Sequence, residues 1–158
     1  MLAEEEFRVD SSIFPVKHDL YGIPGGDRFA NWITTPAGKQ IFEFPPSTIR
    51  MAQNNVGVAG GGYLRLEPYC FTRWAIRHIN DKELRPAMVY FHPWELDPDQ
   101  PRIAAPLRSR FRHYTNLSGM QRKIERLLKD FQFQTVSEVC RQLCASRETA
   151  DTTPAAKA

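Results

Sequence analysis

The chain has 158 residues, of which 42% are hydrophobic and 25% are charged, and its formal net charge at pH 7 is +3. These values are typical of one globular domain, and so small a charge gives little general attraction to nucleic acids or membranes. No stretch approaches the roughly 18 to 20 apolar residues of a membrane span, and the acidic N-terminus does not resemble a signal peptide. We therefore expect a cytoplasmic protein.

The three cysteines are an odd set without the spacing of a metal site: Cys70, Cys140 and Cys144. This pattern argues against a disulfide framework and against a zinc cluster. It predicts thiols in a reducing compartment.

The N-terminal part predicts short strands separated by loops. Residues 2–6 resemble the last turn of a helix, so we expect an upstream part of the fold to be missing. A strand is expected within residues 7–16, a loop over 18–39 with two Pro-Gly turn signals, and a strand over 40–44 that ends at a proline pair. The triple glycine Gly60–Gly62 predicts a tight turn.

Residues 68–81 carry apolar side chains at helical spacing, which predicts an amphipathic helix with an aromatic stripe in the core. The apolar run 87–91 follows a break at Arg85-Pro86 and predicts a buried strand. A helix, a short break and an apolar strand are typical of an α/β unit.

The C-terminal part predicts a basic, irregular stretch over 102–114 and then a helix from Ser118 to Phe131. Residues 131–136 alternate and predict a last strand, and Ser137 begins a final helix that runs through Leu143. The small, polar residues 145–158 predict a disordered tail.

Two side chains at predicted strand ends are candidates for catalysis. His92 follows the strand over 87–91, and an imidazole can accept or give a proton near neutral pH. The alternative is a structural histidine bonded to a loop carbonyl. Asp10 could hold a histidine tautomer, but an aspartate before Ser11-Ser12 is also typical of a turn cap.

Three other motifs have plainer interpretations. The acids Glu95, Asp97 and Asp99 lie in a proline-rich, extended segment that does not favour a metal site. The arginines between residues 102 and 112 favour a solvated loop over a nucleic-acid surface. The triple glycine lacks the Lys-Ser/Thr of a phosphate loop and favours a turn near the rim of a site.

Several motifs in a fixed order carry a family resemblance: FRVDSSIFPVKHDLYGIP, FEFPPSTIR, VAGGGYLRLEPY, YFHPWELDPDQPR and RFRHYTNL. Over residues 2–136 the chain resembles the C-terminal half of polysaccharide deacetylases found with PEP-CTERM exopolysaccharide loci. Those enzymes belong to the NodB-homology carbohydrate esterases. The resemblance implies an α/β fold in which residues 1–144 form the C-terminal half of a distorted, incomplete (β/α) barrel.

The resemblance also implies a chemistry. In the family, a divalent metal such as zinc is held by an aspartate and two histidines, and a late histidine protonates the leaving amine. By position, Val89–His92 matches that late motif, which implies His92 as the general acid, and Asp10 falls near the fourth motif. The early metal and base motifs do not occur here. We therefore expect no metal and no cofactor in this chain.

The first hypothesis is a fragment of an N-deacetylase that hydrolyses the N-acetyl C–N bond of amino sugars in exopolysaccharide and has little activity alone. Its expected partners are an amino-sugar polysaccharide and either a second copy or an upstream half. The second hypothesis is a non-catalytic carbohydrate-binding or protein-interaction module that uses Trp32, Tyr63 and Trp94 as a sugar-binding rim. The third, a nucleic-acid-binding protein, is the least favoured.

Overall fold

The computed structural model describes residues 2–18, 21–58 and 60–151, with residues 146–151 described by their backbone alone. The strands are β1 (Val9–Asp10), β2 (Asn31–Thr34), β3 (Gln40–Glu43), β4 (Thr48–Met51) and β5 (Asn54–Gly57). The helices are α1 (Gly61–Leu66), α2 (Tyr69–Arg77), α3 (Leu107–Tyr114), α4 (Leu117–Asp130) and α5 (Val136–Asp151). A π-helical turn, η1 (His78–Lys82), continues α2, and a 3₁₀ turn, η2 (Pro93–Leu96), follows His92.

Strands β1, β3 and β2 form a sheet with β3 in the middle, parallel to β1 and antiparallel to β2. The strand predicted over 40–44 is confirmed as β3. β2 lies inside the segment predicted as a loop. It pairs with β3 because Thr35 and Gly38 close a tight turn, in which Gly38 has a φ of 78° that favours glycine.

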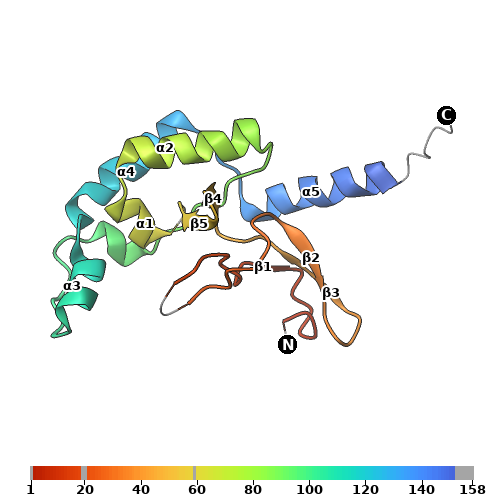
Figure 1. The fold of residues 1–158 in the computed structure, drawn as a ribbon, viewed down its shortest axis with the longest axis horizontal. Helices are drawn as coiled ribbons and strands as arrows, with labels where there is room; N and C mark the ends of the chain where they lie inside the picture. Colours follow the sequence, from red (N-terminus) through yellow and green to blue (C-terminus); the bar gives the residue numbers. More distant parts are fainter. Residues whose placement is uncertain (1, 19–20, 59, 152–158) are drawn as a thin grey trace.

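A second small sheet is the hairpin of β4 and β5, which the sequence analysis did not predict. Its inner side chains, Ile49 and Val58 just beyond β5, are buried against Ala75 and Ile79. The hairpin therefore packs on α2 and η1, between the three-stranded sheet and the helices (Figure 1).

Helices α1, α2 and α4 share a third buried cluster made of Leu64, Ile76, Met120 and Leu127. Figure 1 shows α2 and α4 side by side. The prediction of a helix over 68–81 is confirmed, but the aromatic stripe is not its core face. Residues 72, 75, 76 and 79 are buried at helical spacing, while Trp74 is 49% exposed.

Both strands predicted in the C-terminal part are wrong as paired strands. Residues 87–91 are extended but form no ladder, and Met88 alone exchanges hydrogen bonds with Ser47. Residues 131–135 are also extended without a ladder, and a helix begins at Val136. The alternation of apolar residues favours an extended chain, but it supplies no neighbouring edge to pair with.

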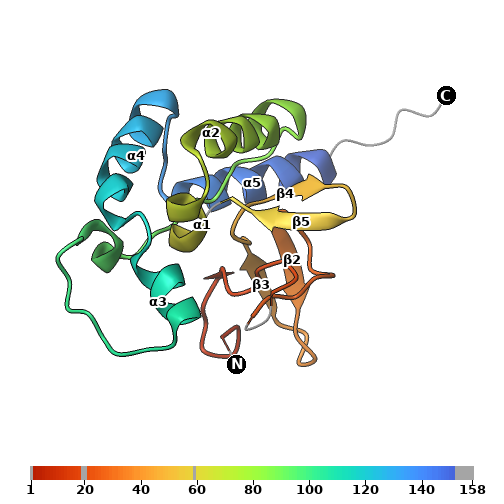
Figure 2. The ribbon, with the colours of Figure 1, turned by 60° about the vertical axis from the view of Figure 1, so that its left-hand side comes forward.

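The cap of α5 is Thr135 rather than the predicted Ser137. Its hydroxyl accepts the Glu138 N–H at 3.3 Å, and the Glu138 carboxylate accepts the Thr135 N–H at 2.9 Å, which is a capping box. The helix runs to Asp151, beyond the predicted end at Leu143, and residues 152–158 of the predicted tail lie outside the described residues. Helix α5 can be followed in Figure 2, and through Cys140 its first turns pack against the core residues of the three-stranded sheet.

The segment predicted as irregular over 102–114 contains helix α3. Pro106 stands directly before its first residue and the arginines inside it are good helix formers, which explains the helix. The fold is mixed α/β, and the described strands form two small sheets that do not close into a barrel. None of the helices in the described part combines the length and the apolarity needed to cross a bilayer.

Candidate functional site

Five ring side chains, here called the aromatic row, lie next to one another near η2: Tyr63, Tyr90, His92, Trp94 and His113. The Trp94 ring is nearly parallel to the rings of His92 and His113, with centroid distances of 5.8 Å and 4.3 Å. Tyr90 meets His92 edge-on at 6.0 Å, because alternate residues of an extended chain share a face. Tyr90 and Trp94 are 38% and 36% exposed, so the row is part of the surface.

A buried ion pair lies beneath the row. The Arg65 Nε donates to Glu95 Oε1 at 2.9 Å, and the two side chains are only 3% and 1% exposed. The second carboxylate oxygen of Glu95 accepts the main-chain N–H of His92 at 2.9 Å. The pair therefore fixes the backbone at the residue where the predicted general acid stands.

The remaining nitrogens of Arg65 are also bonded. They donate to the main-chain oxygens of Arg112, His113 and Thr115, at distances between 2.8 and 3.0 Å. Arg65 thus ties α1 to η2 and to the end of α3. Because both charges are fully hydrogen-bonded, their burial is compensated. We call Arg65 and Glu95 the anchor.

The glycines before α1 make room for the row and the anchor. A Cβ on Gly61 would lie 1.5 Å from Glu95 Oε2, and one on Gly60 would lie 2.9 Å from the Tyr90 hydroxyl. The predicted tight turn is therefore wrong, since α1 begins here and both φ angles stay outside the left-handed region. The glycines are needed for their small size.

Tyr63 closes the row on the side of α1. It lies next to Tyr90 across Gly60 and meets Phe14 edge-on at 5.7 Å. Burial raises the pKa of Tyr63, and its hydrogen bond with Tyr21 acts in the same direction. Burial likewise raises the pKa of Tyr90. Both hydroxyls thus stay protonated at neutral pH and can donate hydrogen bonds.

His113, at the other end of the row, was not predicted as a site residue. Its Nε2 lies 3.0 Å from Gln100 Oε1, and the Gln100 amide donates to the Trp94 carbonyl at 2.9 Å. The loop between η2 and α3 therefore helps to hold the stacked rings in place.

The structure places His92 on the surface, with its ring held by Tyr90 and Trp94 rather than by a carboxylate. No hydrogen bond, ion pair or ring contact joins it to Asp10 within the described residues. His92 does not line the cavity of about 1090 Å³ or the cavity of about 420 Å³ that the described residues form elsewhere. The ring is accessible to a ligand that lies against the row.

Asp10 lies in the three-stranded sheet. Its Oδ1 accepts the Ser11 N–H at 2.8 Å and the Ser12 hydroxyl at 2.5 Å, which is the turn-capping role considered as the alternative. Its neighbour across the strands, Glu43, is buried and accepts the Ile13 N–H at 2.9 Å. Burial raises the pKa of Glu43, and the Asp10 carboxylate adds to this effect.

Trp32 is separate from the other two predicted sugar-binding residues. It lies on β2, meets Phe42 at 5.1 Å in the core under α5, and lines a smaller cavity of about 420 Å³. Tyr63 and Trp94, in contrast, both belong to the aromatic row. The structure therefore brings together His92, Tyr63 and Trp94 but not Asp10 or Trp32.

The fit of a divalent metal can be tested on the donor set. Among the described residues, no three or more His, Cys, Asp and Glu side chains converge in a way that could hold an ion. The Glu95 oxygens are occupied by Arg65 and the His92 backbone, and Asp10 is occupied by its own turn. The residues that the structure describes do not fit the metal of the deacetylases.

A family model described as Domain of unknown function (DUF3473) matches residues 11–141. The chain belongs to the DUF3473 family. Comparisons with curated proteins and with solved structures gave no match. The match includes the whole aromatic row and both residues of the anchor. The description of this family names no activity.

Sequence reasoning missed Arg65, Glu95 and His113. The signal for Glu95 was present, since an acid three residues after His92 and two residues after Pro93 is typical of the first turn of a helix. Arg65 gave no such signal, because an arginine inside a short helix predicts a solvated side chain. Its role depends on α3, which lies about 45 residues further along the chain and was predicted as irregular.

Proposed function

We propose that this DUF3473 chain binds an amino-sugar polysaccharide along the aromatic row and forms the leaving-group side of a polysaccharide N-deacetylase site. The observation that carries the proposal is the stacked set of His92, Trp94 and His113 on a rigid, buried anchor. Aromatic rings that are partly exposed and held by a fixed backbone favour a ligand with apolar C–H faces and hydroxyl groups, such as a pyranose.

His92 is the proposed proton donor. When the C–N bond of an N-acetyl group breaks, the departing nitrogen needs a proton, and an imidazolium can supply it. The exposed ring at the end of segment 87–91 is available for this step, and its stacking on Trp94 restricts its orientation. We further propose that the two small sheets belong to a distorted barrel whose metal-binding residues come from another polypeptide segment.

The test is binding of a defined oligosaccharide to the purified chain. Calorimetry with a tetramer of β-1,4-linked N-acetylglucosamine, and with its deacetylated form, should give a measurable affinity. Trp94→Ala should lower that affinity about 10-fold or more, as expected for an aromatic contact at the centre of an interface. Trp74→Ala is the matched control, because Trp74 is exposed on α2 outside the row.

Hydrolysis provides a second readout. We expect the chain alone to release no acetate from the N-acetylated tetramer, with or without added zinc, because the described residues do not fit a catalytic metal. Release of acetate that a chelator abolishes would contradict the division of the site between two segments. Equal affinity of the Trp94 and Trp74 variants would contradict the binding role of the aromatic row.

A further inference from the structure

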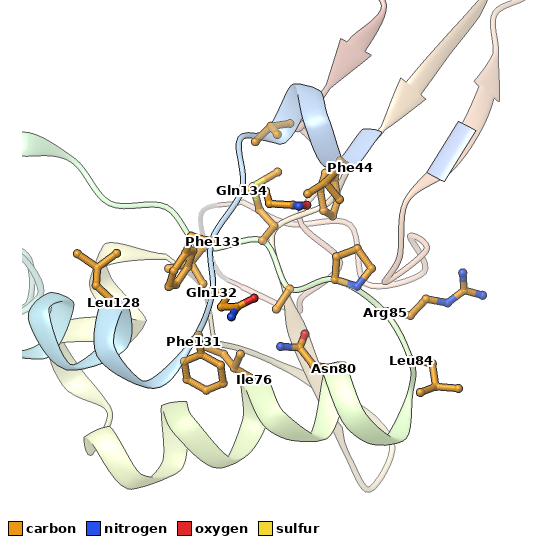
Figure 3. A pocket seen from close by; sticks show the side chains of 16 residues that line it. Phe44, Ile76, Asn80, Leu84, Arg85, Leu128, Phe131, Gln132, Phe133 and Gln134 are labelled. Atoms are coloured by element: carbon orange, nitrogen blue, oxygen red, sulfur yellow. The ribbon is translucent and has the colours of Figure 1, made fainter. Parts of the chain in front are cut away.

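A large groove lies on a part of the molecule that the aromatic row does not use. Its volume is about 1090 Å³, and it is bordered by Leu84 and the extended segment 85–89, by the linker 131–134 and by the helix formed by α2 and η1 (Figure 3). Ile76 and Asn80 line it from the helix side. Both other borders are extended chain, which gives the groove walls of main-chain as well as side-chain atoms.

One wall has an open main-chain edge. The Met88 N–H donates to the Ser47 hydroxyl at 2.7 Å, and the Met88 carbonyl accepts the Ser47 N–H at 3.4 Å. In an extended chain, the main-chain groups of neighbouring residues point to opposite edges. Ala87 and Val89 therefore direct theirs away from Ser47. Both line the groove, and within the described residues their main chain makes no hydrogen bond.

The second wall is open as well. Gln132, Phe133 and Gln134 lie in the linker between α4 and α5, and their main-chain groups make no hydrogen bond within the described part of the chain. All three line the groove. Main-chain N–H and carbonyl groups beside an apolar groove are an unused template for pairing with a strand.

The side chains around the groove indicate the chemistry of an occupant. Leu84 and Leu128 line it and are 79% and 62% exposed, so they add apolar surface to its border. Among the described residues that line the groove, Arg85 is the one with a formally charged side chain, and its guanidinium lies over the Phe29 ring at 5.6 Å. The groove therefore favours apolar side chains and disfavours a positive charge.

We propose that the groove binds one extended strand of a different polypeptide, which pairs with residues 87–89 and with residues 132–134. The strand alternates apolar and polar residues and is uncharged apart from an acid that meets Arg85. At a strand spacing of ~4.8 Å, a layer spacing of ~10 Å and a rise of ~3.3 Å, each residue occupies roughly 160 Å³, so the groove accommodates about seven residues.

A second copy of this chain is a poor occupant. The two extended segments that form the walls of the groove cannot leave their place to fill the groove of another copy. Another exposed stretch without secondary structure, residues 101–106, begins and ends with prolines, which lack main-chain donors, and it carries Arg102, whose positive charge the groove disfavours. Two copies could therefore pair their open main-chain edges, but the part of the groove lined by Ile76 would stay empty. This inference depends on main-chain geometry and stands independently of the proposed sugar site.

The test uses amide hydrogen exchange of the full chain, measured by NMR. The probe is an acetylated and amidated peptide, EVTVTVT, and the control is the same peptide with its three valines N-methylated, which removes main-chain donors and keeps the side chains. We expect fast exchange at Val89 and Gln132–Gln134 in the free chain and slower exchange after the first peptide is added. We expect no change with the methylated peptide.

A pair of variants tests the second wall. Gln134→Pro removes one main-chain donor that has no partner among the residues that the structure describes, so the fold should persist. It should weaken peptide binding about 2- to 10-fold, the usual contribution of one hydrogen bond, while Gln134→Ala should leave binding unchanged.

Three results would overturn the proposal. One is no protection by the peptide at concentrations up to about 1 mM. Another is equal binding of the methylated peptide, which would show an apolar contact without strand pairing. The third is protection of Val89 that rises with protein concentration in the absence of peptide, which would identify a second copy as the occupant.

Discussion

The anchor under the aromatic row and the groove beside α5 differ in how far their polar groups are hydrogen-bonded within the chain. Around the anchor, two buried charges have all their nitrogens and oxygens hydrogen-bonded within the chain. Around the groove, the main-chain groups of Ala87, Val89 and residues 132–134 have no partner within the described part of the chain, and two leucines are exposed. The first region is complete by itself, and the second gains stability from a ligand.

The two regions are joined by one short stretch, residues 85–96. Its first half borders the groove, and its second half, from His92 to Glu95, is fixed by the anchor. Rigidity in this protein is therefore concentrated where the proposed proton donor stands. We expect stability to be as unevenly distributed between the two regions as their hydrogen bonds are.

The largest effect is expected at the anchor. Arg65→Met leaves the buried Glu95 carboxylate without its ion-pair partner and should lower the free energy of unfolding by about 3–5 kcal/mol. The double variant Arg65→Met with Glu95→Leu removes both charges and should recover most of this loss. Urea unfolding followed by fluorescence measures both. A double variant as unstable as the single one would show that packing, and not the unpaired charge, is responsible.

Next in size is the glycine that makes room for the anchor. Gly61→Ala places a methyl group on the Glu95 carboxylate and should cost about 3 kcal/mol. Gly62→Ala is the matched control in the same helix, because nothing lies within 4 Å of a Cβ there. It should raise stability by up to about 1 kcal/mol through helix propensity. Equal effects of the two substitutions in thermal unfolding would refute the steric role of Gly61.

A smaller effect concerns Glu67, at the end of α1. Burial raises its pKa from 4.5 to about 7, while the Lys123 ammonium opposes the shift. The folded state holds the Glu67 proton more tightly than the unfolded state does. The stability that this proton contributes is therefore fully present below about pH 4.5 and is lost as the pH rises through about 7. Glu67→Gln should remove this loss and stabilise the chain at pH 8 by about 1 kcal/mol, after allowance for partial exposure.

The comparison for Glu67 is the wild-type chain at pH 4.5 and at pH 8, with unfolding measured in urea at each value. If the variant and the wild type lose stability in parallel over this range, another group controls the pH dependence. Glu43, whose pKa is also raised by burial, is then the first candidate.

The smallest effect is expected at the groove. Leu128→Gln should change stability by less than about 0.5 kcal/mol, because this leucine is 62% exposed. Its neighbour Leu127, which is 1% exposed, is the control, and Leu127→Ala should cost about 2–5 kcal/mol. A large loss at Leu128 in the same unfolding assay would mean that the groove is filled by the chain itself and is closed to a ligand.

How much of this could be predicted from the sequence depends on whether an element is determined locally. Strand β3, helix α2 and helix α4 were predicted because their apolar spacing and their end signals lie within the segment itself. Helix α3 was missed because four arginines between residues 102 and 112 were interpreted as a solvated loop. The hairpin of β4 and β5 was missed because its strands contain too many polar residues to show the alternation of apolar and polar side chains that predicts a strand.

The candidate site was predicted in part for the same reason. His92 and Trp94 are close in sequence, so their proximity follows from local geometry. Tyr63 reaches them only through the packing of α1. Asp10 was placed with His92 because it stands at a predicted strand end and because the resemblance puts it near a family motif. The unpaired state of residues 87–91 could not be predicted, because a strand pattern says nothing about whether a neighbouring edge exists.

The most direct test of the central claim uses the three tryptophans of the chain as internal reporters. Their indole N–H signals can be followed in a two-dimensional NMR spectrum while the N-acetylglucosamine tetramer is added. The account predicts that the Trp94 signal shifts and saturates, together with ring signals of His92, while Trp32 and Trp74 stay unchanged. A shift at Trp32 or Trp74 with Trp94 unmoved would contradict the aromatic row as the sugar-binding site.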